Sequence, residues 1–474
     1  MHVLTNAEKL IPRRDAASLA ESRKLAGIRI VTGTTSPFTR YERISVSPAS
    51  CSIRSEYVIA FYTFKLQYKC NNSTPAWEQR KFGDCFEFLK SNTLSRAGLN
   101  GENGTARNVH YGDILIKFGD CLDGERSDLP FITDDTVLPK FAGSILREGD
   151  VIFADTAEDE AAGKCVELRK LPKEPTISGL HTIPARPRFF FGTGYLGHYL
   201  NSDAYHRQLL PLMQGIKVIS VSKAALQDTQ VRFPGLSEQA AIGAALSEID
   251  NLITLHQRKY DKLVILKKSM LEKMFPKDGE SVPEIRFAGF TDPWEQRKAS
   301  EVFQIVDDRG HPTLPVLSAT QNQGMIYRDD SGRYIGHDES NEIGYKRVLP
   351  GDFVVHLRSF QGGFAHSQYE GITSPAYTVF RAKEPTSHSD RFWKHWFMSE
   401  HFIAGLSTVT YGIRDGRSIS VDEFMNTFLA FPAVEEQAAI SRLFDYLDDL
   451  ITLHQRKLEL LQNIKKSLLD KMFV

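Results

Sequence analysis

The sequence predicts an α+β fold in which two globular domains of mixed helices and strands are each followed by one long helix. Three observations predict it: the chain contains an internal repeat, the best-matched part of the repeat has a long helical periodicity, and the remainder mixes helix and strand signals. The 474 residues exceed what a single core accommodates, and a composition of 41% hydrophobic and 11% aromatic residues supports folded cores. We therefore expect several folded domains.

The repeat consists of two kinds of matching segment. Trp77-Glu78-Gln79-Arg80-Lys81 recurs as residues 294–298, and Leu252–Lys259 (LITLHQRK) recurs as residues 450–457. Aligning residues 236–275 with 434–473 gives 22 identities in 40 positions, which excludes coincidence. Each unit therefore reads as a Trp-Glu-Gln-Arg-Lys motif, a variable stretch and a well-matched helical stretch, with a pseudo-twofold relation between the two.

The matched stretches predict two long coiled-coil helices. Each stretch is preceded by a proline, as at Phe233-Pro234 and Phe431-Pro432, and has an acid-rich first turn. Both features suit a helix N-terminus. About 39 residues at 1.5 Å each give a rod of roughly 58 Å. The apolar residues that recur every 3.5 positions on average are Ile242, Ile249, Leu263 and Met270 in the first copy and Ile440, Leu447, Leu461 and Leu468 in the second.

One histidine occupies the same position of the coiled-coil seam in each copy, His256 and His454. A metal-binding or switching role is one interpretation. The interpretation that we favour is a packed, hydrogen-bonded side chain that fixes the register of the helices.

These patterns divide the chain into six segments. They are an atypical N-terminal extension (1–70), a first domain (71–235), a first long helix (236–275), a linker rich in proline, glycine and acids (276–293), a second domain (294–432) and a second long helix (433–474).

Within the two domains, corresponding elements are expected in corresponding places. Turn-then-strand patterns are seen at residues 111–116, 149–153 and 350–355, and strand-like segments at 218–222 and 418–421. Aromatic helices are expected at Tyr195–Leu210, with His198, and at Phe392–Leu406, with His395. A glycine-led loop follows each helix, Gly215-Ile216-Lys217 in the first domain and Gly412-Ile413-Arg414 in the second.

Catalytic and metal sites find little support. Gly192–Gly197 matches G-x-G-x-x-G, but no acid lies between Asp203 and Asp228 and Pro211 breaks the helix that a dinucleotide site requires. Hydrolase, P-loop, zinc-protease and deaminase motifs are missing from the sequence, as is the Asp/Asn-Pro-Pro-aromatic motif of an adenine methyltransferase. The cysteines are odd in number and scattered, which argues against disulfides and structural zinc: Cys51, Cys70, Cys85, Cys121 and Cys165.

Charge and hydropathy narrow the function only weakly. The net charge is −1, although the second half of each long helix is basic. The sequence contains no apolar stretch long enough to span a bilayer and no secretory signal pattern, so we expect a cytoplasmic location.

The ordered motifs resemble those of a known family. Pro283-Glu284-Ile285-Arg286-Phe287 before Trp294-Glu295-Gln296-Arg297-Lys298, together with the twin helices, resembles the specificity subunit of type I restriction–modification systems over about residues 71–474. The resemblance implies two target-recognition domains that each read half of a split DNA site, with the antiparallel helix pair as a molecular ruler. It further implies assembly with two modification (methyltransferase) subunits and with restriction subunits, so that S-adenosylmethionine, ATP and Mg would bind to partners and this subunit would be non-catalytic.

The segment before Trp77 departs from the family pattern. The Pro-Glu-Ile-Arg-Phe sequence is missing from the first copy, and some 70 residues precede that copy where the family has a short leader. We favour no defined role for this extension.

Candidate DNA-reading residues follow from side chains that recognise base edges in the major groove, namely Arg or Lys for guanine and Asn or Gln for adenine. In the second domain they are Arg358, Gln361, Arg414 and Arg417, and in the first domain Lys117, Gln214 and Lys217. Ordinary turn residues are the competing interpretation. Two other functions stay open: a coiled-coil scaffold that presents two non-DNA binding domains, and a free-standing endonuclease, which would need a metal-binding carboxylate cluster that the sequence does not reveal.

Overall fold

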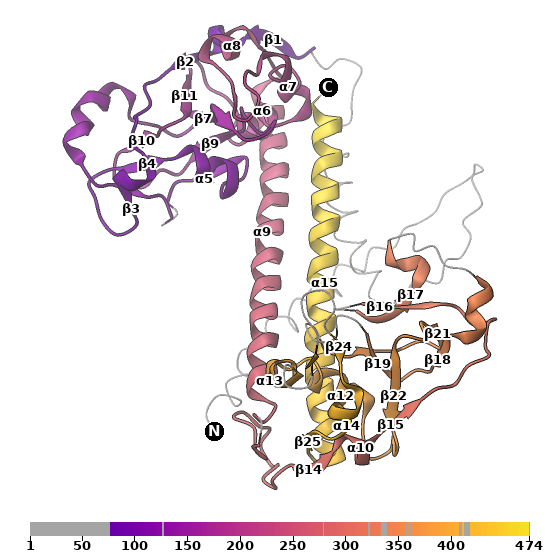
Figure 1. Cartoon of the computed structure of the whole chain (residues 1–474). Helices are drawn as coiled ribbons and strands as arrows, with labels where there is room; N and C mark the ends of the chain where they lie inside the picture. The colour runs from indigo at the N-terminus through magenta and orange to yellow at the C-terminus, as the bar shows by residue number, and fades with distance from the viewer. Residues whose placement is uncertain are drawn as a thin grey trace, which may run out of the picture. The chain divides into compact units, whose positions relative to one another are not determined.

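A computed structural model gives the arrangement of the chain (Figure 1). It describes residues 76–125, 128–277, 279–320, 323–332, 339–356, 359, 363–406, 410–411 and 418–473. The chain divides into two compact units, and the boundaries fall inside the two long helices. We call the described part of residues 76–255 and 458–473 the first unit and the described part of 256–457 the second unit.

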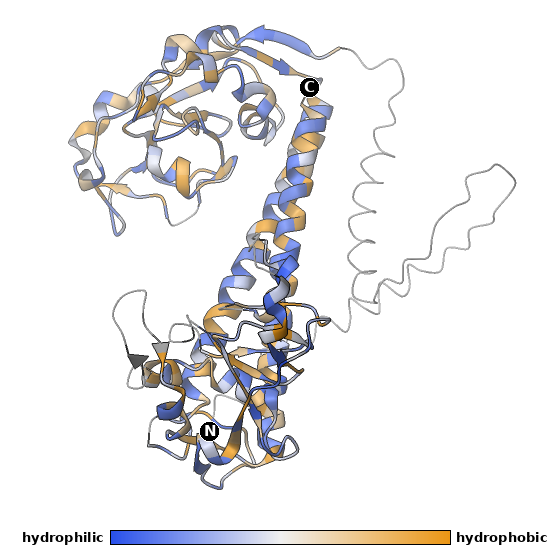
Figure 2. Cartoon of the chain, turned by 45° about the vertical axis from the view of Figure 1, so that its right-hand side comes forward, coloured by the Kyte–Doolittle hydropathy of each residue, from blue (hydrophilic) through white to orange (hydrophobic). Residues whose placement is uncertain are grey.

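The long helices agree with the sequence to within two residues at each end. Helix α9 is Leu236–Lys273 and helix α15 is Val434–Met472. The α+β fold class is confirmed. Among the helices that the structure describes, none combines the length and hydrophobicity that crossing a bilayer requires, and Figure 2 shows hydrophilic residues interspersed with hydrophobic ones along both long helices.

In the first unit, strands build two main sheets, ordered β2-β11-β7-β9-β5 and β10-β4-β6-β3. The strands are β1 (Glu78–Lys81), β2 (Phe86–Phe88), β3 (Leu99–Asn100), β4 (Arg107–Val109), β5 (Cys121–Asp123), β6 (Phe131–Ile132), β7 (Val151–Ala154), β8 (Thr156–Ala157), β9 (Cys165–Arg169), β10 (Thr176–Ser178), β11 (Thr182–Pro187), β12 (Ile219–Ser220) and β13 (Gln230–Phe233). The helices of this domain are α4 (Phe82–Cys85), α5 (Tyr111–Ile116), α6 (Tyr195–Leu200), α7 (Asp203–His206) and α8 (Lys223–Asp228), with 3₁₀ turns at Arg96–Gly98, Asp135–Ser144 and Leu210–Leu212.

In the second unit, the main sheet has the order β15-β22-β19-β20. The strands are β14 (Glu295–Lys298), β15 (Phe303–Val306), β16 (Leu317–Thr320), β17 (Gly324–Tyr327), β18 (Lys346–Val348), β19 (Phe353–Val355), β20 (Ala365–His366), β21 (Gly371–Thr373), β22 (Thr378–Ala382), β23 (Thr410–Tyr411), β24 (Ser418–Ile419) and β25 (Phe428–Phe431). The helices of this domain are α10 (Ala299–Val302), α12 (Asp390–Trp396), α13 (Glu400–Gly405) and α14 (Val421–Met425), with 3₁₀ turns at Arg328–Ser331 and Glu339–Gly344.

The Trp-Glu-Gln-Arg-Lys repeat closes each domain. In the first unit its strand, β1, pairs antiparallel with β13, which directly precedes α9. In the second unit β14 pairs in the same way with β25, which precedes α15. The tryptophan of each motif packs on the phenylalanine at the end of a long helix: Trp77 on Phe473 and Trp294 on Phe275, both with ring centroids 6.3 Å apart. The repeated motif therefore joins the start of each domain to the long helices.

The two long helices run antiparallel where they meet. In the second unit, His256 contacts His454 and Phe275 contacts Phe444, so positions increase along α9 as they decrease along α15. In the first unit, Ile242 and Leu246 of α9 share a core cluster with Phe473, which directly follows α15. The packed, hydrogen-bonded contact expected of the two histidines is present: their Nδ1 atoms lie 2.8 Å apart in a hydrogen bond, and His256 is buried. That the pair fixes the register of the helices stays a prediction.

Gly243 is the one glycine within α9. A Cβ at this position would lie 2.3 Å from the carbonyl oxygen of Thr193, so the helix touches the loop before α6 directly. Gly194 in that loop has φ +82°, a conformation that favours glycine. The glycine-rich segment and the helix glycine thus belong to one close contact.

Two local predictions were wrong. Residues 111–116 form helix α5 instead of a strand, because His110 caps the first turn by accepting from the Gly112 amide. The helix also places Ile114 in the core and leaves Ile116 86% exposed, whereas a strand would have put both on one face. Each aromatic helix is divided in two, α6 with α7 and α12 with α13, where Ser202 and Ser399 start a new helix. The strands expected near residues 151–153, 353–355, 219–220 and 418–419 are present.

Candidate functional site

Each long helix is fastened to its domain by one buried glutamine. In the first unit, the Gln239 side chain accepts a hydrogen bond from the Gly192 amide (2.8 Å) and donates to the Pro234 carbonyl (2.8 Å). In the second unit, Gln437 accepts from the Ser389 amide (3.0 Å) and donates to the Pro432 carbonyl (2.8 Å). Both glutamines belong to a Glu-Gln-Ala-Ala-Ile sequence that is identical in the two copies, at residues 238–242 and 436–440. The repeat therefore preserves the same attachment in both copies.

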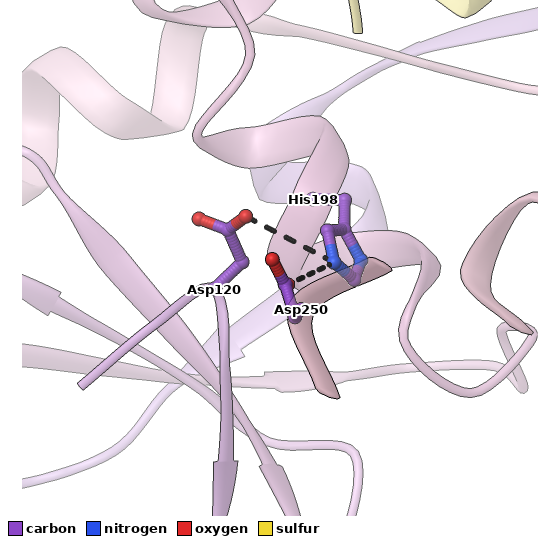
Figure 3. Close-up of side chains that lie close together, drawn as sticks. All are labelled: Asp120, His198 and Asp250. Atoms are coloured by element: carbon purple, nitrogen blue, oxygen red, sulfur yellow. Dashed lines mark hydrogen bonds and ion pairs between the residues drawn. The ribbon is translucent and has the colours of Figure 1, made fainter. Parts of the chain in front are cut away.

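Next to this attachment the first unit gathers four charged side chains, which we call the junction cluster: Asp120, His198, Asp250 and Lys465. Figure 3 shows how the first three meet: Asp120 from the segment before β5, His198 from α6 and Asp250 from α9. The His198 Nε2 atom lies 2.9 Å from an Asp250 oxygen and 3.9 Å from an Asp120 oxygen. Lys465 of α15 joins both carboxylates, with Nζ 2.7 Å from Asp120 and 2.5 Å from Asp250.

The charge state of His198 follows from its surroundings. Burial disfavours the imidazolium, but the hydrogen bond to Asp250, with Cys121 and Asp120 nearby, outweighs it and raises the pKa of His198 to about 10. The His198 Nδ1 atom lies 2.5 Å from the Gly194 carbonyl oxygen, so both ring nitrogens face acceptors and both donate. For Asp250, burial opposes ionisation, yet the pKa is lowered by His198 and Lys465. The cluster thus holds two cations and two anions.

The second unit has a related but different arrangement. Lys267 lies 2.5 Å from Asp448, and these residues match Lys465 and Asp250 at the repeat shift. His395 of α12 takes the place of His198 and lies 3.2 Å from Asp445. Burial and the nearby Lys394 lower the pKa of His395 despite its hydrogen bond to Asp445. The helix-to-helix ion pair is therefore common to both copies, whereas the histidine is charged in only one.

Asp120, His198 and Asp250 could in principle hold a divalent cation, since one ligand atom from each lies within 4.8 Å of the others. The Lys465 ammonium already contacts both carboxylates and, with His198, balances their charge. The matching Lys267–Asp448 pair also shows that this contact belongs to the repeat. We therefore interpret the cluster as an ion-pair network.

The sequence analysis missed this cluster because its members are far apart along the chain. The identity of Lys465 with Lys267 and of Asp250 with Asp448 in the aligned copies was the available signal.

The G-x-G-x-x-G segment has a structural explanation as well. Its Gly194 and Gly197 amides donate to the two carboxylate oxygens of Glu167, at 2.5 and 2.9 Å. Burial raises the pKa of Glu167, and these two amide hydrogen bonds oppose that rise. The loop that resembles a phosphate cradle therefore binds a carboxylate of its own domain.

The described DNA-reading candidates lie on two elements of the first domain. Lys117 follows α5 and forms an ion pair with Asp113 at 3.0 Å, so part of its charge is already engaged. Gln214 and Lys217 share one loop, whose ends are held by reciprocal backbone hydrogen bonds between Gln214 and Ser220. Gly215 in this loop has φ +115°, and Lys217 is exposed. Outside the described residues lie Arg358, Gln361, Arg414, Arg417 and the N-terminal extension 1–70.

Comparisons with known proteins show what the chain is similar to. No family model matches it. It is 25% identical over 276 residues to the type I restriction enzyme MjaVIII specificity subunit of Methanocaldococcus jannaschii, a match that covers 54% of this chain and 64% of that protein. It is 20% identical over 334 residues to the putative type I restriction enzyme MjaX specificity subunit of the same organism, covering 68% of this chain and 77% of that protein.

A solved structure shares the fold. The crystal structure of a type I restriction–modification system S subunit from M. genitalium matches with a TM-score of 0.50 and 11% identity, over 86% of this chain and 98% of that one. The chain is similar to type I specificity subunits. This similarity confirms the resemblance that the sequence motifs indicated.

Proposed function

We propose that this chain is the DNA-recognition subunit of a type I restriction–modification complex, in which each domain reads one half of a bipartite site and the helix pair sets the spacing. One observation carries the proposal: two unlike domains are attached by the same contacts to two long helices that share 22 of 40 aligned residues. These contacts are Gln239 and Gln437 to the domains, and Lys465–Asp250 and Lys267–Asp448 between the helices. A reader of two different half-sites needs variable domains on a constant frame, because half-site spacing is fixed by duplex geometry.

Base recognition would fall to exposed loops of the domains. The Gln214–Ser220 loop offers Gln214 for adenine and Lys217 for guanine or phosphate, and Gly215 allows close backbone approach. Lys117 is a further candidate of the first domain. In the second domain we keep Arg358, Gln361, Arg414 and Arg417, of which Arg414 follows the glycine and isoleucine that match Gly215 and Ile216.

The partners in this proposal are two modification subunits, restriction subunits and double-stranded DNA. The chain supplies no catalytic group, and S-adenosylmethionine, ATP and Mg bind to the partners, all in the cytoplasm. With a net charge of −1, the chain would depend on its partners for part of the phosphate contacts.

Methylome sequencing tests the proposal directly. Cells that carry this chain and its cognate methyltransferase should show adenine methylation at one asymmetric split sequence, and cells without the chain should not. Lys217→Ala should weaken recognition of one half-site by about 1–3 kcal/mol per lost base contact and leave the other half-site unchanged. Methylation that does not depend on the chain would overturn the proposal, and a stable methyltransferase complex without sequence preference would favour the scaffold function instead.

The spacing role has its own test. A four-residue insertion near Asp261 of α9 adds about 6 Å of helix and should alter the spacer length without altering either half-site. An unchanged spacer in the methylome would refute this role.

A further inference from the structure

The junction cluster connects the first domain to both long helices. Asp120 and His198 come from the domain, Asp250 from α9 and Lys465 from α15, so four side chains tie one domain to both long helices at once. We propose that Asp120, His198 and Lys465 are positioning residues that fix the orientation of the first domain on the helix pair, and that they thereby restrict the spacer length which the subunit accepts. This inference rests on the proposed function.

The domain side of the cluster is rigidly built. The Asp120 carbonyl accepts from the Glu167 amide at 3.0 Å, and its carboxylate accepts from Asn201 at 2.9 Å. A Cβ on Gly197 would lie 2.2 Å from the Asp120 carbonyl oxygen, so the backbone of α6 packs directly against this segment. Since β9, α6 and the segment before β5 hold one another, a displacement of Asp120 would require the whole domain to move.

The helix side is directional. The His198 ring donates from both nitrogens, to Gly194 and to Asp250, and cannot rotate without losing one bond. Lys465 spans Asp120 and Asp250, and its side chain is 19% exposed, so water competes weakly for its charge. The contacts are thus satisfied in one orientation of the domain relative to the helices.

Such a network is better suited to positioning than to stability. The desolvation of buried ion pairs offsets much of their attraction, so a balanced set of charges adds little net stability but strongly disfavours other orientations. The second unit lacks an equal arrangement at His395, because the Nδ1 atom of that residue has no hydrogen-bond partner among the described residues. The inference is therefore specific to the first domain.

The test uses the complex of the full chain with its methyltransferase partner and DNA duplexes that carry both half-sites, taken from the methylome, at spacers one or two base pairs shorter or longer. The variants are Asp120→Asn and His198→Gln. The matched control is Asp123→Asn, three residues away, whose side chain is 47% exposed and 3.7 Å from Lys170. We expect both variants to raise methylation at non-cognate spacers by about tenfold relative to the cognate spacer, since a displacement of about 1 Å can change rates by up to about 10²-fold. Half-site preferences should stay as in the wild type.

Two further measurements separate positioning from loss of folding. Combining Asp120→Asn with Lys465→Met should reduce spacer discrimination by less than the sum of the two single losses, because both variants open the same contact. Lys465→Met opens the same contact from the helix side and carries the test if Asp120→Asn does not assemble. Unaltered spacer discrimination in His198→Gln and Lys465→Met would overturn the inference. A wild-type complex that methylates no split sequence would instead overturn the proposed function.

Discussion

His198 and His395 occupy matching helices of the two domains, and each faces an aspartate of a long helix, yet their charge states differ. His198 has an acceptor at each ring nitrogen and a pKa raised to about 10, whereas the pKa of His395 is lowered by burial. The difference lies in the neighbours: Gly194 and Asp120 surround the first histidine, and Lys394 lies near the second. The repeat therefore preserves a residue and its place without preserving its charge, because the charge is decided by partners that come from the variable domains.

In the second unit, the linker forms an ion pair with the long helix that has no counterpart, among the described residues, at the matching glutamate of the first unit. Arg286 forms a bidentate pair with Glu436, both hydrogen bonds being 2.7 Å, and the Glu436 side chain is 1% exposed. Glu238 matches Glu436 in the repeat but is only half-buried. The second helix is thus anchored through the linker, and the first helix through the junction cluster.

The largest expected effect comes from removing Arg286. Arg286→Ala leaves the Glu436 carboxylate buried without its partner and should destabilise the second unit by roughly 3–5 kcal/mol. Glu238→Ala in the first unit is the matched control and should cost less than about 1 kcal/mol. Chemical denaturation followed by hydrogen exchange in each unit measures both. Equal losses in the two units would show that the linker pair is no special anchor.

A smaller effect is expected from the glutamines that the two copies share. Gln239→Ala leaves the buried Gly192 amide without its partner, and Gln437→Ala does the same to the part-buried Ser389 amide. Each variant should cost about 1–3 kcal/mol. Similar losses would support a common attachment. A loss confined to one unit would mean that the other helix is held mainly by its apolar contacts.

A fall in pH should destabilise the second unit more than the first. In the second unit the pKa values of His256, His388, His395 and His454 are all lowered, mainly by burial, so the folded unit binds fewer protons than the unfolded chain below pH 6.5. Its free energy of unfolding therefore falls as the pH drops from about 6.5. In the first unit burial lowers the pKa of His110, whereas the stabilising contribution of His198 is complete below pH 6.5 and is lost as the pH rises through about 10.

Hydrogen exchange at pH 7.5 and 5.5, corrected for the intrinsic exchange rate, measures this difference. We expect the second unit to lose about 1–3 kcal/mol relative to the first over this range. His395→Asn should reduce the loss, whereas His198→Gln should leave it unchanged. Greater acid sensitivity in the first unit would contradict the assigned charge states.

The long helices were easier to predict from the sequence than the contacts that attach them to the domains. Helices α9 and α15 were predictable because apolar periodicity and the repeat reinforce each other over a long stretch. Residues 111–116 were not, since Tyr111, Ile114 and Ile116 favour a strand and the decisive His110 cap is a single local contact. The repeat marks Asp250 and Lys465 of the junction cluster, but the sequence could not supply the whole cluster: Asp120 and Lys465 are 345 positions apart, and only the fold brings them together.

The smallest expected effect concerns His256 of α9 and His454 of α15, which contact each other within the second unit. Their pKa values are lowered by burial and by Lys457 and Lys259, that of His256 to about 4, so at neutral pH both rings are neutral and one donates to the other. Replacing both by leucine removes donor and acceptor together and should change the free energy of unfolding by less than about 1 kcal/mol at pH 7.

Replacing only His256 by leucine leaves His454 without its partner and should cost about 0.5–1.5 kcal/mol. The double variant should also be less sensitive to acid than the wild type, because protonation of the facing rings next to two lysines is no longer possible. A double variant that is less stable than the single one would mean that these histidines have a further partner and are not simply a register pair. Thermal denaturation of the three proteins at pH 7 and pH 5 decides between these outcomes.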